Sequence, residues 1–255
     1  MTQQQQRHIR ILEYLHQNRH AQVTHLAKYL GVSSVTVRKD VTLLEQRKLL
    51  LRFQGYIELN TSTAVHRRLL ANYARKLSIA KKAAALIADG DTVILESGTC
   101  CILLAQELKN EGKTVTILTN STFLADFISP CRSITLILLG GTYQPDSMAT
   151  VGPVTRACLT PFYAKYLFSG TDGYTTAHGF GGDNPERIDV LRHMAAHADK
   201  TVILTESQKF FASGTMQLFS TNEVDTVVTD EHIDPQTESE LLAHDIQILK
   251  AHEEV

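Results

Sequence analysis

Apolar side chains recur every three or four residues in three short segments near the start of the chain, which is the spacing of amphipathic helices. In the first segment, Ile9, Leu12 and Leu15 share one helical face. The second segment is predicted to begin at an N-cap, Thr24, and to end at Gly31, a residue that readily adopts left-handed backbone. Two short helices separated by a turn are therefore expected within the first 31 residues.

The third segment follows at once and has the clearest pattern. Ser33 is predicted to cap a helix, because its hydroxyl can accept from the first free amides. Val37, Val41 and Leu44 then repeat at helical spacing and define the buried side. A helix, a short turn that contains glycine and a second helix together form the helix-turn-helix pattern.

The outward side of this third helix combines hydroxyls, cations and one apolar residue. The helical angle places Val35, Lys39 and Thr42 opposite the buried side, with Thr36 and Arg38 on the flanks. Ser34, in the first turn of the helix, is a further candidate for DNA contact. A helix that is merely solvated more often presents glutamates, glutamines and lysines. Cations and hydroxyls that can donate, with a branched side chain that can touch a thymine methyl group, are suited to the DNA major groove. We therefore expect this face to contact DNA.

Two short apolar runs around Gln54 and Gly55 predict a hairpin directly after the third helix, which is the position of a wing. Arg52 and Tyr56 on this hairpin could contact phosphates. The alternative for the whole segment is a small three-helix module that binds another protein and no nucleic acid. Compact basic helix-turn-helix units commonly bind nucleic acid, and this favours the DNA-binding interpretation.

From about residue 75 the pattern changes to short apolar strands that alternate with helices. One helix is expected to end at Gly90, and strands are expected near residues 91–96, 114–120, 133–141, 200–206, 224–230 and 245–250. Such alternation predicts an α/β domain with a largely parallel sheet. The domain organisation expected is therefore residues 1–59, a linker over 60–74, and an α/β domain over 75–255.

Polar residues and glycines follow the predicted strands, at the sheet edge where ligands of α/β folds bind. The sequence Ser97-Gly98-Thr99 opens a helix, and free amides at a helix N-terminus are suited to phosphate. Carboxylates and an amide would bind hydroxyls, a lysine would assist at the phosphate, and glycines would allow close approach of backbone. These remaining candidates for a sugar-phosphate site are Glu96, Asn120, Gly140, Gly141, Asp172, Gly173, Glu206 and Lys209.

Charge is divided unevenly, although the whole chain carries a net charge of only −2. Residues 1–59 contain nine lysines or arginines against four acidic residues, whereas the rest contains 16 against 23. A basic segment on an acidic body is typical of a nucleic-acid-binding domain joined to a domain with another role.

Cysteines and apolar runs exclude several classes of protein. The four cysteines form no Cys-x-x-Cys pair and have no zinc-ligand spacing, so reduced thiols and no metal are expected. The first ten residues lack the apolar region of a secretory signal, and no apolar run approaches the length of a membrane span. We therefore expect a cytoplasmic protein.

These features together resemble the DeoR-type bacterial transcription regulators along essentially the whole chain. The stretch VSSVTVRKDVTLLEQRKLLLRFQG is similar to the head of that family, with Ser33, Thr36, Val37, Arg38, Asp40 and Leu44 on its usual positions. ESGTC stands where the family commonly has DSGTT, and TESQKF stands where it commonly has DSSKF. LLGGTY and FSGTDGYTTAHGF are also similar to family segments.

The resemblance implies a winged helix-turn-helix head and a sensor body whose fold is similar to ribose-5-phosphate isomerase. It implies a repressor of carbohydrate genes, released by a phosphorylated sugar, with no other cofactor and no enzymatic activity. A homodimer or homotetramer on double-stranded DNA is expected, because one small head contacts too little DNA for high specificity. Departures from the family are Glu96 and Glu206 in place of aspartates, Cys100 in place of threonine, and Gln54 in the wing.

Two other functions compete with this interpretation. A sugar-phosphate isomerase could use Glu96 or Glu206 as general base with Lys209 as electrostatic partner, but an isomerase needs no basic head. A redox sensor could use Cys100, because a helix N-terminus lowers the pKa of a thiol, and this requires an exposed thiol. Glu96 and Glu206 could also pair with lysines in a purely structural role.

Overall fold

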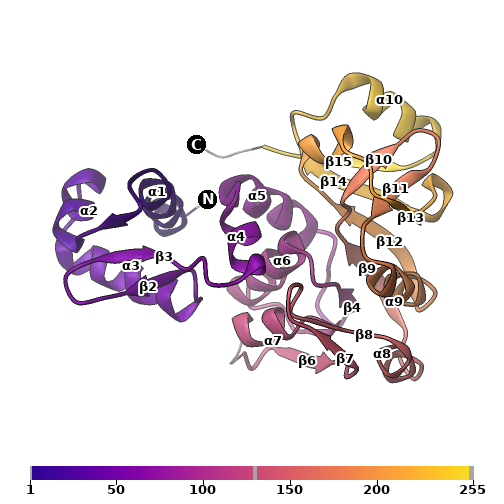
Figure 1. Ribbon diagram of the computed structural model, residues 1–255, viewed down its shortest axis with the longest axis horizontal. Helices are drawn as coiled ribbons and strands as arrows, with labels where there is room; N and C mark the ends of the chain where they lie inside the picture. Colours follow the sequence, from indigo (N-terminus) through magenta and orange to yellow (C-terminus); the bar gives the residue numbers. More distant parts are fainter. Residues whose placement is uncertain (1, 129–130, 253–255) are drawn as a thin grey trace. The chain divides into compact units, whose positions relative to one another are not determined.

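The computed structural model describes residues 2–128 and 131–252. The chain divides into two compact units, and the boundary between them in the sequence lies between Ala74 and Arg75. The first unit contains helices α1 (Gln3–Asn18), α2 (Val23–Leu30), α3 (Ser34–Gln46) and α4 (Ala64–Leu70), and strands β1 (His20–Ala21), β2 (Leu50–Arg52) and β3 (Ile57–Leu59). The three strands form an antiparallel sheet in the order β1-β3-β2 (Figure 1). This is a winged helix-turn-helix fold, as the sequence predicts.

The apolar stripes of the first three helices form the core of this unit. Leu15, Leu26, Val37 and Leu44 are all buried. The hydroxyl of Ser33 accepts from the amide of Thr36 at 3.1 Å, so the predicted cap of α3 is confirmed.

The first two helices and the linker differ in detail from the sequence prediction. Thr24 is not the cap of α2, because the carbonyl of Gln22 already accepts from the amide of Leu26 and the helix begins at Val23. Gly31 ends α2 in left-handed backbone, as predicted. Residues 60–74 group with the first unit and include α4.

A buried carboxylate joins α1 to α3. Asp40 is 1% exposed and accepts from Arg7 Nε at 2.7 Å, while His8 Nε2 lies 3.2 Å from its other oxygen. Burial lowers the pKa of His8 to about 4, although the charge of Asp40 acts in the opposite direction. Burial acts to raise the pKa of Asp40, but the hydrogen bond from Arg7 holds that pKa below its ordinary value.

These shifts predict that acid destabilises the first unit. When the pH is below the ordinary pKa of histidine, unfolding lets His8 take up a proton, and this favours the unfolded state. The contribution of neutral His8 to the free energy of unfolding is therefore complete above pH ~6.5 and is lost as the pH falls toward 4. From pH 7 to pH 5 we expect the free energy of unfolding to fall by about 2 kcal/mol. Hydrogen exchange of α3 amides in the full chain measures this loss. His8→Gln should remove most of the pH dependence, whereas His16→Gln, which changes an exposed histidine of the same helix, should leave it intact.

The second unit is built on a parallel seven-stranded sheet in the order β15-β14-β12-β9-β4-β5-β6. Its strands are β4 (Thr92–Leu95), β5 (Val115–Thr119), β6 (Ile134–Leu138), β9 (Ala164–Ser169), β12 (Ala198–Leu204), β14 (Thr226–Asp230) and β15 (Gln247–Ala251). Its helices are α5 (Tyr73–Ala84), α6 (Thr99–Asn110), α7 (Thr122–Ile128), α8 (Pro153–Leu159), α9 (Pro185–Ala195) and α10 (Pro235–Ala243). The predicted parallel α/β architecture is therefore confirmed.

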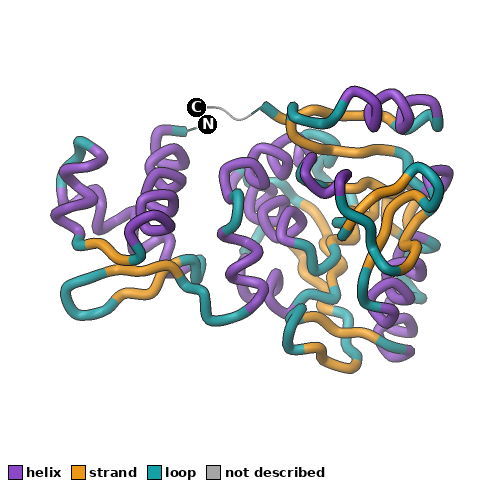
Figure 2. Tube along the Cα trace, turned by 45° about the horizontal axis from the view of Figure 1, so that its top comes forward, coloured by secondary structure: helices purple, strands orange, loops and turns teal. Residues whose placement is uncertain are grey.

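Helices cover both faces of this sheet, with α6 and α7 on one face and α9 on the other (Figures 1 and 2). The chain runs from β4 outward to β5 and β6, then returns to β9 beside β4 and runs the other way to β12, β14 and β15. The strand order therefore reverses between β4 and β9. In open α/β sheets such a switch point leaves a crevice beyond the carboxyl ends of the strands, where ligands bind.

Two small antiparallel sheets were not predicted. One contains β7 (Thr142–Gln144) and β8 (Ala149–Val151), and the other contains β10 (Gly173–Thr175), β11 (Gly179–Gly182) and β13 (Met216–Phe219). Their strands are only three or four residues long, so they lack the longer apolar runs of the main sheet. Helix α5 ends at Ala84 and not at Gly90. The amides of Leu86 and Ile87 donate to carbonyls three residues back, those of Ala83 and Ala84, and not to carbonyls four residues back as in an α-helix. In the part of the chain that the structure describes, no helix has the length and apolar character to cross a membrane.

Candidate functional site

Two separate surfaces gather the residues that the sequence singled out, one in each unit. In the first unit, α3 exposes the side opposite its buried stripe. Val35 is 59% exposed, and Arg38 and Lys39 are also exposed. An apolar side chain and two adjacent cations thus stand on a rigid helix, because the opposite side of that helix is locked in the core.

The hydroxyls of α3 are partly engaged within the helix. Ser34, Thr36 and Thr42 are half-buried. The hydroxyls of Thr36 and Ser33 lie 2.9 Å apart, and Thr42 donates to the carbonyl of Arg38 at 2.8 Å. Arg38, Lys39 and Val35 are therefore the side chains of this face best placed to contact a partner.

The hairpin of β2 and β3 presents aromatic rings in addition to the predicted cation. Arg52 lies 3.8 Å from Glu45, so its charge is partly balanced. Phe53 and Tyr56 stack with ring centroids 4.9 Å apart, and both remain exposed. Phe53 was missed from the sequence, although aromatic residues on both sides of a two-residue turn are a usable signal.

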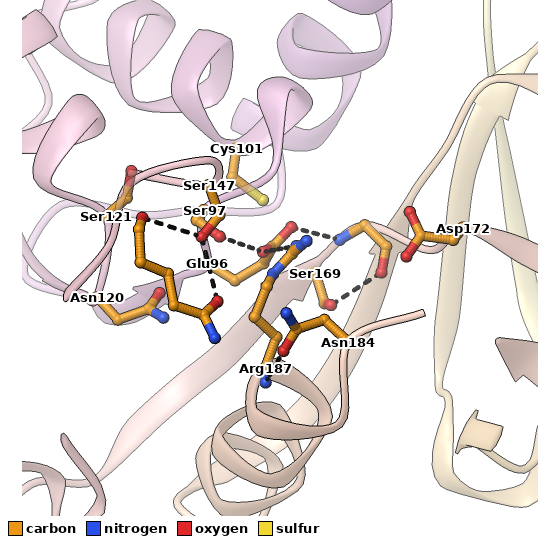
Figure 3. A network of polar contacts seen from close by, with 12 residues as sticks. Glu96, Ser97, Cys101, Asn120, Ser121, Ser147, Ser169, Asp172, Asn184 and Arg187 are labelled. Atoms are coloured by element: carbon orange, nitrogen blue, oxygen red, sulfur yellow. Dashed lines mark hydrogen bonds and ion pairs between the residues drawn. The ribbon is translucent and has the colours of Figure 1, made fainter. Parts of the chain in front are cut away.

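In the second unit, the candidate ligand residues follow five neighbouring strands at one edge of the sheet. Glu96 follows β4, Asn120 follows β5, Gly140 follows β6, Asp172 follows β9 and Glu206 follows β12. Figure 3 shows several of these side chains together at the reversal between β4 and β9. The sequence prediction that they converge is thereby supported by the order of the strands.

Glu96 occupies the switch point itself and is buried. Its Oε1 accepts from the amide of Gly170 at 3.0 Å, while its Oε2 accepts from Ser97 at 3.3 Å and lies 3.5 Å from the Arg187 guanidinium (Figure 3). These contacts fix the Glu96 carboxylate and orient Arg187, which enters from α9. Arg187 was missed from the sequence because helix residues reach a sheet edge only through tertiary packing.

Helix α6 begins beside this carboxylate. Among the described residues no side chain caps its first turn, whose N-cap is Gly98. Thr99 and Gly98 are half-buried, and the Ser97 hydroxyl is directed to Glu96. A helix start that no side chain caps presents amides and a positive dipole end, which an anion can use.

Asn120 offers an acceptor that the protein itself leaves unused. Its amide nitrogen donates to the carbonyl of Thr150 at 2.9 Å. Its Oδ1 is buried and has no hydrogen-bond partner among the described residues. A buried acceptor that lacks a hydrogen bond lowers the stability of the fold. We therefore expect this oxygen to accept a hydrogen bond from a ligand hydroxyl.

The remaining carboxylates are also paired with cations. Asp172 and Lys209 lie 4.0 Å apart and are both partly exposed. Glu206 is buried and lies 3.6 Å from Lys76 of α5, a residue that the sequence did not identify. Burial lowers the pKa of Lys76, and the charge of Glu206 opposes that change.

Two of the predicted glycines have a packing role. Gly141 has φ +148°, and a side chain there would collide with Thr155. Gly173 lies against the backbone of Ala212, which likewise leaves no room for a side chain. These glycines allow chain segments to pack closely, and this differs from the predicted approach of their backbone to a ligand.

The alternative of a redox sensor at Cys100 is not supported. The thiol is buried, and this burial raises its pKa to about 12, opposite to the shift that a reactive thiol requires. Cys101 is buried as well, with its Sγ 3.3 Å from the carbonyl of Phe168.

Comparison with known families gives two matches that together cover most of the chain. Residues 7–63 match the DeoR-like helix-turn-helix domain, and residues 71–231 match the DeoR C terminal sensor domain. The gap between the matched regions is helix α4 (Ala64–Leu70), which belongs to the first unit.

Individual relatives are similar over nearly their whole length. The chain is 27% identical over 255 residues to the HTH-type transcriptional regulator UlaR of Shigella dysenteriae serotype 1, covering 96% of this chain and 98% of that one. It is 27% identical to the HTH-type transcriptional regulator GolR of Listeria innocua serovar 6a, with 89% and 91% covered. A relative of Escherichia coli O157:H7, named for transcriptional repression of an aga operon, is 29% identical, with 91% and 88% covered.

Among solved structures, ribose 5-phosphate isomerase A of Methanocaldococcus jannaschii matches with a TM-score of 0.40 and 19% identity. That match covers 55% of each chain. The beta subunit of eIF2B from Chaetomium thermophilum matches with a TM-score of 0.46 and 11% identity, over 70% of this chain and 56% of that one.

Proposed function

The chain belongs to the DeoR family of transcription regulators, and from this premise we propose that it is a DNA-binding repressor of carbohydrate genes. A phosphorylated sugar bound by the second unit would release it from its operator. The observation that carries this proposal is the uncapped start of α6 at the switch point, in the same chain as a helix-turn-helix head. An anion site and a DNA-binding head in one chain fit a regulator controlled by an anionic metabolite.

For the DNA contact, we propose that α3 enters the major groove and that the hairpin lies against the backbone. Arg38 and Val35 would contact base edges, because arginine pairs with guanine and a branched apolar side chain fits a thymine methyl. Lys39 would contact phosphate as a point charge. Two heads on two half-sites would supply specificity, so we propose a homodimer or homotetramer joined through the second unit.

For the effector, we propose that Ser97, Gly98 and Thr99 hold the phosphate through backbone amides and the Thr99 hydroxyl, with Lys209 as the nearby cation. Asn120 would accept from a sugar hydroxyl, which would satisfy its unpaired Oδ1. Glu96 would act mainly by orienting Arg187 toward the ligand. No further cofactor is part of this proposal.

A role as isomerase is not favoured. A general base must be free to take a proton, and Glu96 accepts from a backbone amide and a hydroxyl beside the Arg187 cation. Glu206 is buried against Lys76. Carboxylates held in this way support binding and orientation more readily than proton transfer.

Operator binding in the presence of matched sugars tests the proposed function. DNA fragments selected in vitro by the full chain would be titrated with the protein at fixed salt, alone and with pentose or hexose phosphates. At least one phosphorylated sugar should weaken binding about 5-fold or more, while the same sugar without phosphate has no effect. Equal release by both forms of every sugar, or a strictly monomeric mass with and without DNA, would contradict the corresponding part of the proposal.

A further inference from the structure

The carboxylates at the ligand edge are paired with cations in a pattern that singles out one helix. Glu96 pairs with Arg187 of α9, and Asp172 pairs with Lys209 of the 3-10 helix Ser207–Phe211 that follows β12. The next two carboxylates along the sheet, Glu206 after β12 and Asp230 at the end of β14, both pair with α5. Their partners are consecutive residues of that helix.

Those partners stand at the start of the second unit. Lys76 lies 3.6 Å from Glu206, and Arg75 lies 3.8 Å from Asp230. Helix α5 begins at Tyr73, and the boundary between the two units follows Ala74. The first turn of the helix that joins the head to the body is thus bound electrostatically to the carboxyl ends of two strands.

The pair of Lys76 and Glu206 is the buried one. Their side chains are only 6% and 7% exposed, so water screens the pair poorly and a new charge nearby acts on it strongly. Lys209 belongs to the same short turn as Glu206, and its positive charge acts on Lys76. A phosphate bound beside Lys209 would therefore change the balance of charges that holds Lys76.

We propose that Lys76 and Glu206, supported by Arg75 and Asp230, couple effector occupancy to the head. The inference rests on the proposed function, since it requires an effector phosphate near Lys209. Negative charge brought by the effector draws Lys76 away from Glu206 and moves the first turn of α5. That turn is connected covalently to α4 and the head, so its movement would act on the head. The proposal therefore requires its position to differ between the DNA-competent and released states, as allosteric coupling demands.

The test compares Lys76→Met with Lys82→Met, which removes an exposed lysine from the same helix. The probe is the phosphorylated sugar that releases the wild-type chain most strongly, applied beside its unphosphorylated form. The measured quantity is the ratio of operator affinities without and with the probe, which is about 5- to 150-fold in typical allosteric proteins. We expect Lys76→Met to bind operator and probe but to give a ratio near 1. Lys82→Met and the charge-conserving Lys76→Arg should keep most of the response.

If the wild type responds to the probe and Lys76→Met gives the same ratio of operator affinities, the coupling role of Lys76 is overturned while the proposed function stands. If no sugar phosphate releases the wild type, the proposed function fails and the coupling role fails with it. Removal of Lys76 takes the cation from the buried Glu206 carboxylate, so a second measurement covers a variant that fails to fold. Hydrogen exchange of residues 73–84 in the wild type then decides: the probe should alter exchange in the first turn of α5, and unchanged exchange overturns the inference.

Discussion

Replacement of Arg38 by alanine is expected to abolish specific operator binding and to leave the fold intact. The side chain is exposed on α3, on the side opposite Val37, Val41 and Leu44, so its removal creates no cavity. A bidentate contact of arginine with guanine contributes roughly 1–3 kcal/mol of discrimination. With two heads on one operator, the loss amounts to about 4 kcal/mol, or nearly a thousandfold in affinity. Titration of selected and random DNA at several salt concentrations measures it.

Lys28→Ala is the matched control, since Lys28 is an exposed cation of α2 outside the proposed base-contacting face. Loss of a cation that only touches phosphate weakens binding to all sequences and lowers the salt dependence. Arg38→Ala should instead reduce the preference for the selected site over random DNA. If Arg38→Ala keeps that preference, α3 is not the helix that contacts the bases.

The sequence predicted the convergence of the effector site because parallel strands place their carboxyl ends at one edge. Glu96, Asn120 and Glu206 each follow an apolar strand that the hydrophobic pattern identifies. Which strands are neighbours could not be deduced from that pattern. The reversal between β4 and β9 depends on β9, a strand that the pattern did not identify and that pairs in parallel with both β4 and β12.

The partners of the carboxylates could not be predicted from the sequence, for a different reason. Arg187 and Lys76 belong to helices far along the chain from Glu96 and Glu206, and only packing brings them to the sheet edge. The sequence left open whether Glu96 and Glu206 bind hydroxyls or pair with lysines, whereas the structure pairs Glu206 with Lys76 and Glu96 with an arginine. In the proposed site, a phosphate would gain its affinity from the amides at the start of α6 and from Lys209, whose 4.0 Å pair with Asp172 is partly exposed.

Removal of the proposed phosphate contacts is expected to abolish the response to the effector. Thr99→Ala combined with Lys209→Ala should leave operator affinity within about twofold of the wild type and remove the response to the releasing sugar phosphate. Hydrogen bonds to charged groups contribute roughly 1.5–3 kcal/mol each, so effector affinity should fall by at least about 100-fold. The measurement is operator release over a wide range of effector concentrations, together with the thermal shift that the effector produces.

Lys200→Ala is the control for this pair, because Lys200 is exposed on β12, the strand that Glu206 and Lys209 follow. It removes one cation from the same strand without touching the proposed site, so the response should remain. A double variant that still responds at the wild-type effector concentration would show that the phosphate lies elsewhere. Loss of operator affinity in the double variant would instead indicate that Lys209 supports the DNA-competent state directly, because an effector contact can alter binding only through its difference between the two states.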